Sequence, residues 1–319
     1  MADTKYFVVG ATGSQGGSVV KALLAEGVPG ANITGMTRNP DSEKAKSLAS
    51  LGCCLVKGDL NDPTSLTSLK GKFEGTDSVF VVTDYWQSCG LDVDKEIAQL
   101  KAIADELKET SSVKHIVFST LDDTRPIIGK DIPPLKDSWI TPHFDGKGAM
   151  TSYFRDILKL PVTLYYTTYY SENSFGILKP NKGDDGVFTM AYPMADKPLA
   201  IVALGDLGKG AAKIMVQGPE KWAGKNFFVT SDLIPVAEMA AKLGAAADVT
   251  VNYYPITREG FAAFGFPGAD DLANMFAFYQ YDVFINNHNV EDSKALLGEV
   301  ESFDKTIQKN IDAVKAALS

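Results

Sequence analysis

The stretch VVGATGSQGGSVV, residues 8–20, decides the fold class of this chain. Gly10, Gly13 and Gly16 lie between a short apolar run, KYFVV (5–9), and a segment whose apolar residues share one helical face. Glycine permits a tight turn and lets backbone N–H groups approach a diphosphate at a helix N-terminus, where the helix dipole favours negative charge. The order of strand, glycine-rich turn and helix predicts a dinucleotide site; a plain strand-to-helix turn is the alternative.

Strand and helix patterns alternate through the first half of the chain. Strands are expected at 5–9, 33–37, 53–57, 77–83, 115–119 and 162–167, and helices at 43–51, 64–73, 92–110 and around Lys147. Strands separated by helices predict an α/β fold with a Rossmann-type, doubly wound parallel sheet. The segment 120–142 contains four prolines and is expected to be a loop.

The second half is less regular and predicts a smaller C-terminal α+β lobe. A strand turning into a helix is expected at 200–215, a seventh strand at 225–232, another strand at 249–256, and helices at 236–244, 257–265 and 303–318. The predicted division is a dinucleotide-binding Rossmann domain at 1–165 and a smaller C-terminal lobe at 166–319, partly interleaved with the Rossmann sheet.

The composition excludes several classes of protein. The chain has 319 residues, a net charge of −9 and 45% hydrophobic residues. Direct nucleic-acid binding is not expected, because it needs basic side chains, and no apolar run is long enough to cross a membrane. The three cysteines lack metal-like spacing, and no secretory signal is apparent. A cytoplasmic protein, with the nucleus as a further location, and no metal site are therefore expected.

The end of the second predicted strand indicates which dinucleotide is bound. NAD-binding proteins usually place an acid there to accept from the ribose 2′-OH, but this chain has Arg38. A guanidinium group suits a 2′-phosphate, and Lys44 or Lys46 can add positive charge, although Asp41 and Glu43 reduce it. The sequence therefore predicts NADP(H); a solvated surface arginine is the alternative.

Two further strand ends carry polar residues suited to a nucleotide. Asp59 and Leu60 follow the third predicted strand, where an acid can accept from the adenine amine. Thr83, Asp84 and Tyr85 follow the fourth, near the expected positions of the adenosine ribose and the diphosphate. Asp59 also suits a turn, and both roles can hold together.

His143 and Lys147 lie four residues apart on a predicted helix and share one face. Short-chain dehydrogenases place a tyrosine and a lysine at this spacing, the tyrosine as proton donor and the lysine on the nicotinamide ribose. Histidine can donate a proton in principle, and Ser119 could polarise a carbonyl. A histidine that hydrogen-bonds the preceding loop is the alternative, so no catalytic residue is assigned.

Several motifs together resemble those of the NmrA-like proteins, which are atypical relatives of the short-chain dehydrogenases. The matching stretches are GATGSQGGSVV (10–20), TRNP (37–40), VTDYWQSC (82–89), HFDGKG (143–148), YFRDI (153–157), YSEN (170–173) and FGFPGADDLANMF (264–276). The last is not a general Rossmann feature and makes the resemblance specific. Within the family, the chain is most similar to the NADPH-binding redox sensors.

The resemblance implies a set of cofactor contacts. By this resemblance, the diphosphate is bound by Gly10, Ala11, Thr12, Gly13, Ser14 and Gln15, and the 2′-phosphate by Arg38 and Lys44. Adenine is contacted by Asp59 and Leu60, and the nucleotide backbone by Thr83, Asp84 and Tyr85. The nicotinamide ribose is bound by Lys147, and the nicotinamide is flanked by Tyr170, Ser171, Glu172 and Asn173. The acids near Arg38 depart from the family pattern and weaken the lysine contacts.

Two functions follow from these observations. The first is an NADP(H)-binding regulator, a redox sensor or transcriptional co-regulator that acts through a transcription factor or signalling protein, without substrate turnover. The second is an NADPH-dependent reductase of quinone or isoflavone-like substrates, with aromatic residues stacking on the substrate. A homodimer is compatible with either function.

Overall fold

The structure is a computed structural model that describes residues 3–62 and 69–319. The chain forms two compact units, and neither is one continuous segment. The first unit contains residues 1–123, 142–166 and 207–227, and the second contains residues 124–141, 167–206 and 228–319. No helix among the described residues is long and apolar enough to cross a membrane.

A seven-stranded sheet with the order β11-β6-β5-β4-β1-β2-β3 forms the centre of the first unit. Its strands are β1 (Tyr6–Val8), β2 (Ile33–Thr37), β3 (Cys54–Lys57), β4 (Ser78–Val81), β5 (His115–Thr120), β6 (Val162–Tyr166) and β11 (Asn226–Phe228). The pairings from β3 across to β6 are all parallel. β4 and β5 are buried along their whole length, as strands covered on both faces must be.

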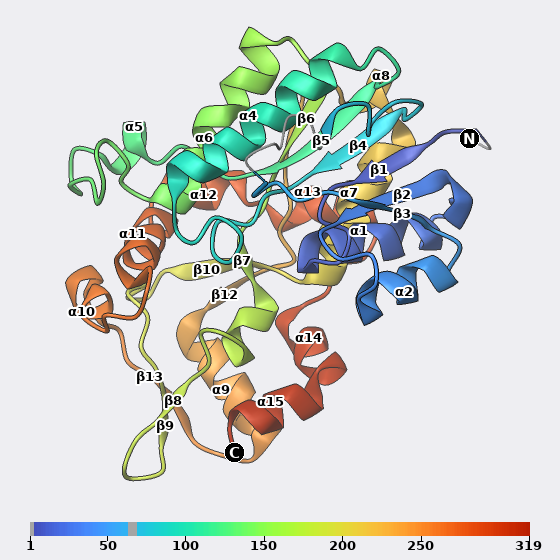
Figure 1. Cartoon of the computed structure of the whole chain (residues 1–319). Helices are drawn as coiled ribbons and strands as arrows, with labels where there is room; N and C mark the ends of the chain where they lie inside the picture. Colours follow the sequence, from blue (N-terminus) through green and yellow to red (C-terminus); the bar gives the residue numbers. More distant parts are fainter. Residues whose placement is uncertain (1–2, 63–68) are drawn as a thin grey trace. The chain divides into compact units, whose positions relative to one another are not determined.

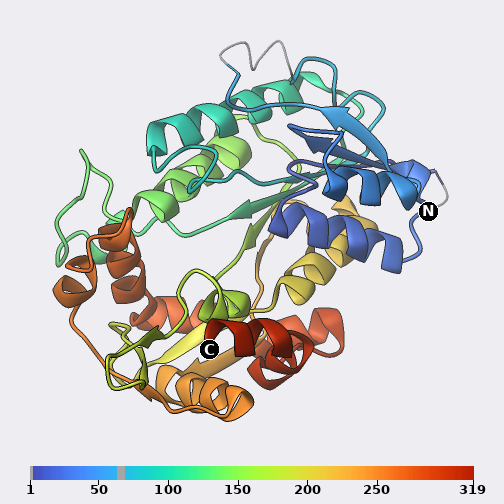
Figure 2. The same ribbon diagram turned by 60° about the horizontal axis from the view of Figure 1, so that its bottom comes forward.

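Helices cover both faces of this sheet (Figure 1). They are α1 (Ser14–Ala25), η1 (Gly30–Asn32), α2 (Glu43–Ser50), α4 (Val93–Glu109), α6 (Pro142–Ser152), η2 (Tyr153–Ile157), α7 (Leu204–Gln217), whose first three residues belong to the second unit, and α8 (Pro219–Trp222). α1 and α2 lie on one face, and α4 and α6 lie on the other (Figures 1 and 2). The sheet is therefore doubly wound, as the alternation of strands and helices predicts.

Local sequence explains where α4 begins and which face it buries. Asp92 caps the helix, since its Oδ1 accepts from the N–H groups of Asp94 and Lys95. A stripe at helical spacing turns inward and contains Val93, Glu96, Leu100, Ile103 and Leu107. One member of this buried stripe is an acid.

The second unit contains two three-stranded sheets, with the orders β12-β10-β7 and β13-β9-β8. The strands are β7 (Tyr169–Tyr170), β8 (Asn181–Lys182), β9 (Phe188–Met190), β10 (Pro198–Val202), β12 (Asp232–Pro235) and β13 (Val251–Tyr253). Its helices are α5 (Arg125–Ile128), η3 (Ser171–Phe175), α9 (Val236–Ala247), α10 (Arg258–Ala262), α11 (Ala269–Tyr279), α12 (Asp282–Asn287), α13 (Val290–Leu297), α14 (Phe303–Lys309) and α15 (Ile311–Ala317).

The observed elements differ from the predicted ones in several places. The helix expected at 303–318 is broken at Asn310, whose backbone leaves the helical region (φ −119°, ψ 27°). The strand expected at 225–232 ends at Phe228, and Asp232 starts a strand of another sheet. The expected loop 120–142 contains the single-turn helix α5, where Pro126 occupies the first turn and its missing N–H costs nothing. Much of the helix expected at 64–73 lies outside the described residues.

Candidate functional site

The loop between β1 and α1 has the geometry of a phosphate-binding turn. Gly10 has φ +64°, a conformation that L side chains rarely adopt, and its carbonyl accepts from the N–H of Gly13 at 2.9 Å. A Cβ atom on Gly16 would lie 2.3 Å from that carbonyl oxygen. The first turn of the helix can therefore approach the loop this closely only with glycine at position 16.

The N-terminus of α1 is suited to an anion. Gly13 is the N-cap residue, and in this fully described helix no side chain caps the terminus and the first turn contains no acid. The helix dipole and the N–H groups of the first turn are thus available to a negatively charged group. The loop is fixed from its sides, because Ala11 N–H donates to the carbonyl of Met36 and the hydroxyls of Thr12 and Thr37 lie 2.9 Å apart. A diphosphate fits this arrangement.

Arg38 is exposed directly after β2, next to this loop in the sheet order. The Arg38 guanidinium donates a long hydrogen bond of 3.5 Å to Ser88 Oγ, and Ser88 Oγ also accepts from Asn61 Nδ2 at 3.1 Å. Lys44 is exposed on α2. Lys46, in contrast, forms an ion pair with Glu43, so Arg38 and Lys44 are the better candidates for a phosphate.

The residues after β3 and β4 are engaged in local structure. Asp59 Oδ1 accepts from Asn61 N–H at 3.0 Å, which is the expected turn role, and Leu60 is half-buried. The carboxylate of Asp84 accepts from the N–H of Gln87. The hydroxyl of Tyr85 donates to the carbonyl of Leu91 at 3.1 Å. Contact of these residues with a nucleotide stays a prediction.

Lys147 forms a buried ion pair inside the first unit. Its Nζ lies 2.6 Å from Oε1 of Glu96, and the side chains are 10% and 0% exposed. Thr83 Oγ1 donates to the same carboxylate oxygen at 2.8 Å. Two predicted cofactor residues, Thr83 and Lys147, are therefore brought together by an acid that the sequence reasoning had not singled out. The signal was available, since Glu96 interrupts the apolar stripe of α4.

His143 is 5% exposed and lies among aromatic rings. The ring centroids of Trp86 and Phe144 are 4.9 and 4.8 Å from that of His143, and Tyr85 is 6.0 Å away. Ser119, the other candidate for polarising a substrate, donates its hydroxyl to Gln15 Oε1 at 2.6 Å. Both side chains that could assist a reduction are thus packed or hydrogen-bonded within the protein.

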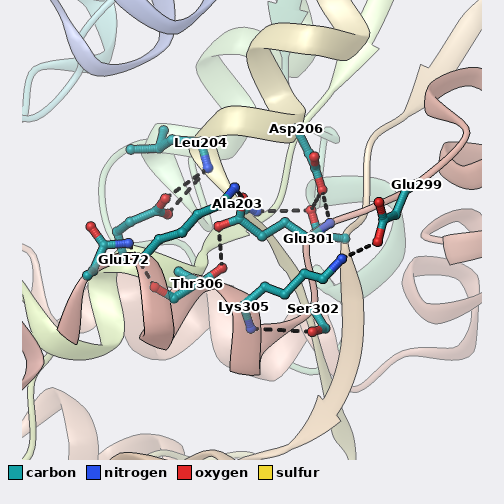
Figure 3. Close-up of polar contacts among 12 residues, drawn as sticks. Glu172, Ala203, Leu204, Asp206, Glu299, Glu301, Ser302, Lys305 and Thr306 are labelled. Carbon is teal, nitrogen blue, oxygen red and sulfur yellow. Dashed lines mark hydrogen bonds and ion pairs between the residues drawn. The ribbon is translucent and has the colours of Figure 1, made fainter.

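The predicted residues 170–173 belong to the second unit, where they form β7 and η3. The carboxylate of Glu172 accepts from the N–H of Leu204, at 3.1 Å for Oε1, and so caps the start of α7 (Figure 3). Burial raises the pKa of the Glu172 carboxyl, and the negative charges of Glu301 and Asp206 raise it further. Tyr170 and Asn173 are half-buried, and Ser171 is buried.

Cys89 is a buried thiol in the segment after β4. Its Sγ lies 3.5 Å from Oε1 of Gln99, and the side chain is buried. Burial raises the pKa of the Cys89 thiol to about 12, with Glu96 adding to the effect. A thiol that stays protonated is a poor nucleophile, which disfavours a nucleophilic role for Cys89.

Comparison with known proteins agrees with this geometry. The sequence profile described as the NmrA-like family matches residues 2–314. The chain belongs to the NmrA-like family. One relative, the NmrA-like family domain-containing oxidoreductase lnbB of Aspergillus flavus, is 26% identical over 284 residues, which cover 84% of this chain and 81% of that protein.

Two solved structures with a similar fold are a transcriptional regulator and an oxidoreductase. The negative transcriptional regulator NmrA in complex with NADP is 18% identical, with a TM-score of 0.75 and coverage of 99% of this chain and 98% of that one. The NADPH-dependent quinone oxidoreductase of Escherichia coli, complexed with NADPH, is 20% identical, with a TM-score of 0.70 and coverage of 95% and 99%. The prediction of a Rossmann-type sheet is confirmed; at this identity the likeness concerns the fold alone.

Proposed function

We propose that this chain binds NADP(H) in its first unit and acts as a regulatory protein without substrate turnover. The loop of residues 10–15 and the uncapped N-terminus of α1 hold the diphosphate, and Arg38 holds the 2′-phosphate, assisted by Lys44. The absence of an acid directly after β2 disfavours a free 2′-OH at that point. The related structures of NmrA with NADP and with NAD, and of the quinone oxidoreductase with NADPH, support a nicotinamide dinucleotide as the ligand.

The burial of His143 carries the second half of the proposal. When bound, the nicotinamide supplies a hydride, and reduction of a carbonyl or quinone then needs a proton donor beside the substrate. His143 stands at the position of the expected donor but is 5% exposed and packed against Trp86 and Phe144. The Ser119 hydroxyl is directed to Gln15. The burial of His143 and the hydrogen bond from Ser119 to Gln15 support a role without proton transfer to a substrate.

A regulator of this kind acts through a protein partner. Its output requires that cofactor occupancy change the affinity for that partner. The net charge of −9 favours a partner with a basic surface, such as a transcription factor or a signalling protein. The name of the related NmrA regulator supports transcriptional control as the setting.

The second candidate is an NADPH-dependent reductase of quinone or isoflavone-like substrates. It is favoured by the names of relatives, which include an Aspergillus flavus oxidoreductase and a quinone oxidoreductase. In this candidate, a water molecule or the ligand itself supplies the proton for the reduced substrate in place of His143 and Ser119.

Binding is tested by titrating NADPH and NADH into the wild type and Arg38→Ala. Loss of a charged hydrogen bond to the 2′-phosphate is expected to weaken NADPH roughly tenfold to a hundredfold and to leave NADH nearly unchanged. Lys46→Ala is the matched control, because it removes a nearby positive charge already paired with Glu43. Equal losses for both nucleotides in Arg38→Ala would overturn the assignment.

A further inference from the structure

The ion pair between Lys147 and Glu96 joins three chain segments at one buried point. Oε1 of Glu96 accepts from Lys147 Nζ at 2.6 Å and from Thr83 Oγ1 at 2.8 Å. Thr83 follows β4, Glu96 lies on α4 and Lys147 lies on α6. Lys147 Nζ also lies 3.5 Å from the carbonyl of His143. An ammonium group has three donors, so the pair leaves Lys147 able to donate to a ligand.

The other carboxylate oxygen of Glu96, Oε2, is buried and accepts no hydrogen bond from the described residues. It faces α6 at a point where a Cβ atom on Gly146 would lie 3.6 Å away. Lys147 is the one cation that forms an ion pair with Glu96 in the described part of the chain. Each charge is therefore neutralised by the other, and the pair as a whole carries no net charge.

This neutrality matters because the two forms of the cofactor differ in charge at one end. The nicotinamide ring is a cation when oxidised and is neutral when reduced. Lys147 is predicted to contact the ribose that carries this ring. A bare ammonium group at that position would repel the oxidised ring, whereas a neutralised one would not.

We propose that Glu96 is a specificity-determining residue of the cofactor site, which lets the site accept NADP⁺ as well as NADPH by neutralising Lys147. The inference rests on the proposed function and adds a rule for redox selectivity to it. Because both forms bind, they compete, and the form that occupies the site follows the ratio of NADPH to NADP⁺.

The test is Glu96→Gln, which removes the charge and keeps an oxygen that can accept from Lys147 and Thr83. Dissociation constants for NADP⁺ and NADPH are measured by calorimetry on the full chain. The ratio of the NADP⁺ constant to the NADPH constant is expected to rise on the order of tenfold. Lys147→Met, which leaves the carboxylate alone, is expected to shift the ratio in the opposite direction. An unchanged ratio, or an equal loss for both forms, would show a purely structural role and overturn the proposal.

Two controls separate charge from packing. Asp105→Asn alters an exposed ion pair with Lys101 on the same helix and is expected to leave the ratio unchanged. The double variant Glu96→Gln/Lys147→Met has a neutral pair again and is expected to return the ratio to that of the wild type. A shift that persists in the double variant contradicts the proposal. A wild type that binds neither form refutes the proposed function itself.

Discussion

Replacing Lys147 by methionine is expected to destabilise the protein because it leaves the Glu96 carboxylate buried without its cation. None of the Glu96 side chain is exposed, and Thr83 would remain as its one described donor. Breaking a buried ion pair by removing one partner typically costs about 3–5 kcal/mol of unfolding free energy. The loss for Lys147→Met is expected to fall within this range, because the Glu96 carboxylate is not exposed to water.

The assay is urea unfolding with linear extrapolation to zero denaturant. Lys101→Met is the matched control, because Lys101 forms an ion pair of the same 2.6 Å length with Asp105, but those side chains are 53% and 37% exposed. The control is expected to lose less than about 1 kcal/mol. Adding Glu96→Gln to Lys147→Met is expected to recover most of the loss. A single variant as stable as the control, or a double variant no better than the single, would refute this reasoning.

Three further outcomes are expected. Gly16→Ala would place a Cβ atom 2.3 Å from the carbonyl oxygen of Gly10. It should weaken NADPH binding and lower the free energy of unfolding by about 1–3 kcal/mol. Gly17→Ala, whose Cβ atom would lie 3.3 Å from the carbonyl oxygen of Ala11, should have smaller effects on both quantities. Burial lowers the pKa of His288 from 6.5 to about 3. The unfolded chain therefore binds the proton more readily than the folded chain, and the free energy of unfolding should fall as the pH drops below 6.5. At pH 5 this loss should be about 2 kcal/mol relative to neutral pH. His288→Asn should remove that part of the pH dependence in urea titrations, and an unchanged dependence would argue against it. In a thiol-labelling assay at neutral pH, the exposed Cys54 should react fast. Buried Cys89, whose thiol has a pKa of about 12, should react slowly. Fast labelling that persists in Cys54→Ser would contradict this expectation.

Local patterns predicted much of the first unit. The strand at 33–37 matches β2 in both bounds, and the glycine loop lies between β1 and α1 as expected. Arg38 directly follows β2, as the sequence predicts. These features depend on neighbouring residues, which a sequence displays directly.

Other features depend on residues far apart in the chain. Lys147 and Glu96 are separated by 51 positions, and no local pattern specifies that α4 and α6 bring them together. Glu172 caps α7 through Leu204, 32 positions later, while its predicted contact with the nicotinamide stays a prediction. The break at Asn310 interrupts a pattern that remains amphipathic on both sides. In each case tertiary packing decides the outcome.

The most direct measurement of the central claim is the fate of NADPH bound to the wild-type protein. The protein is loaded with NADPH, and the absorbance of the reduced nicotinamide is followed after addition of quinones, isoflavone-like compounds and aldehydes, with free NADPH as the reference. Because His143 is buried and the Ser119 hydroxyl donates to Gln15, the absorbance is expected to decay no faster than in the reference. Protein-dependent oxidation of the bound NADPH by any of these compounds would contradict the account.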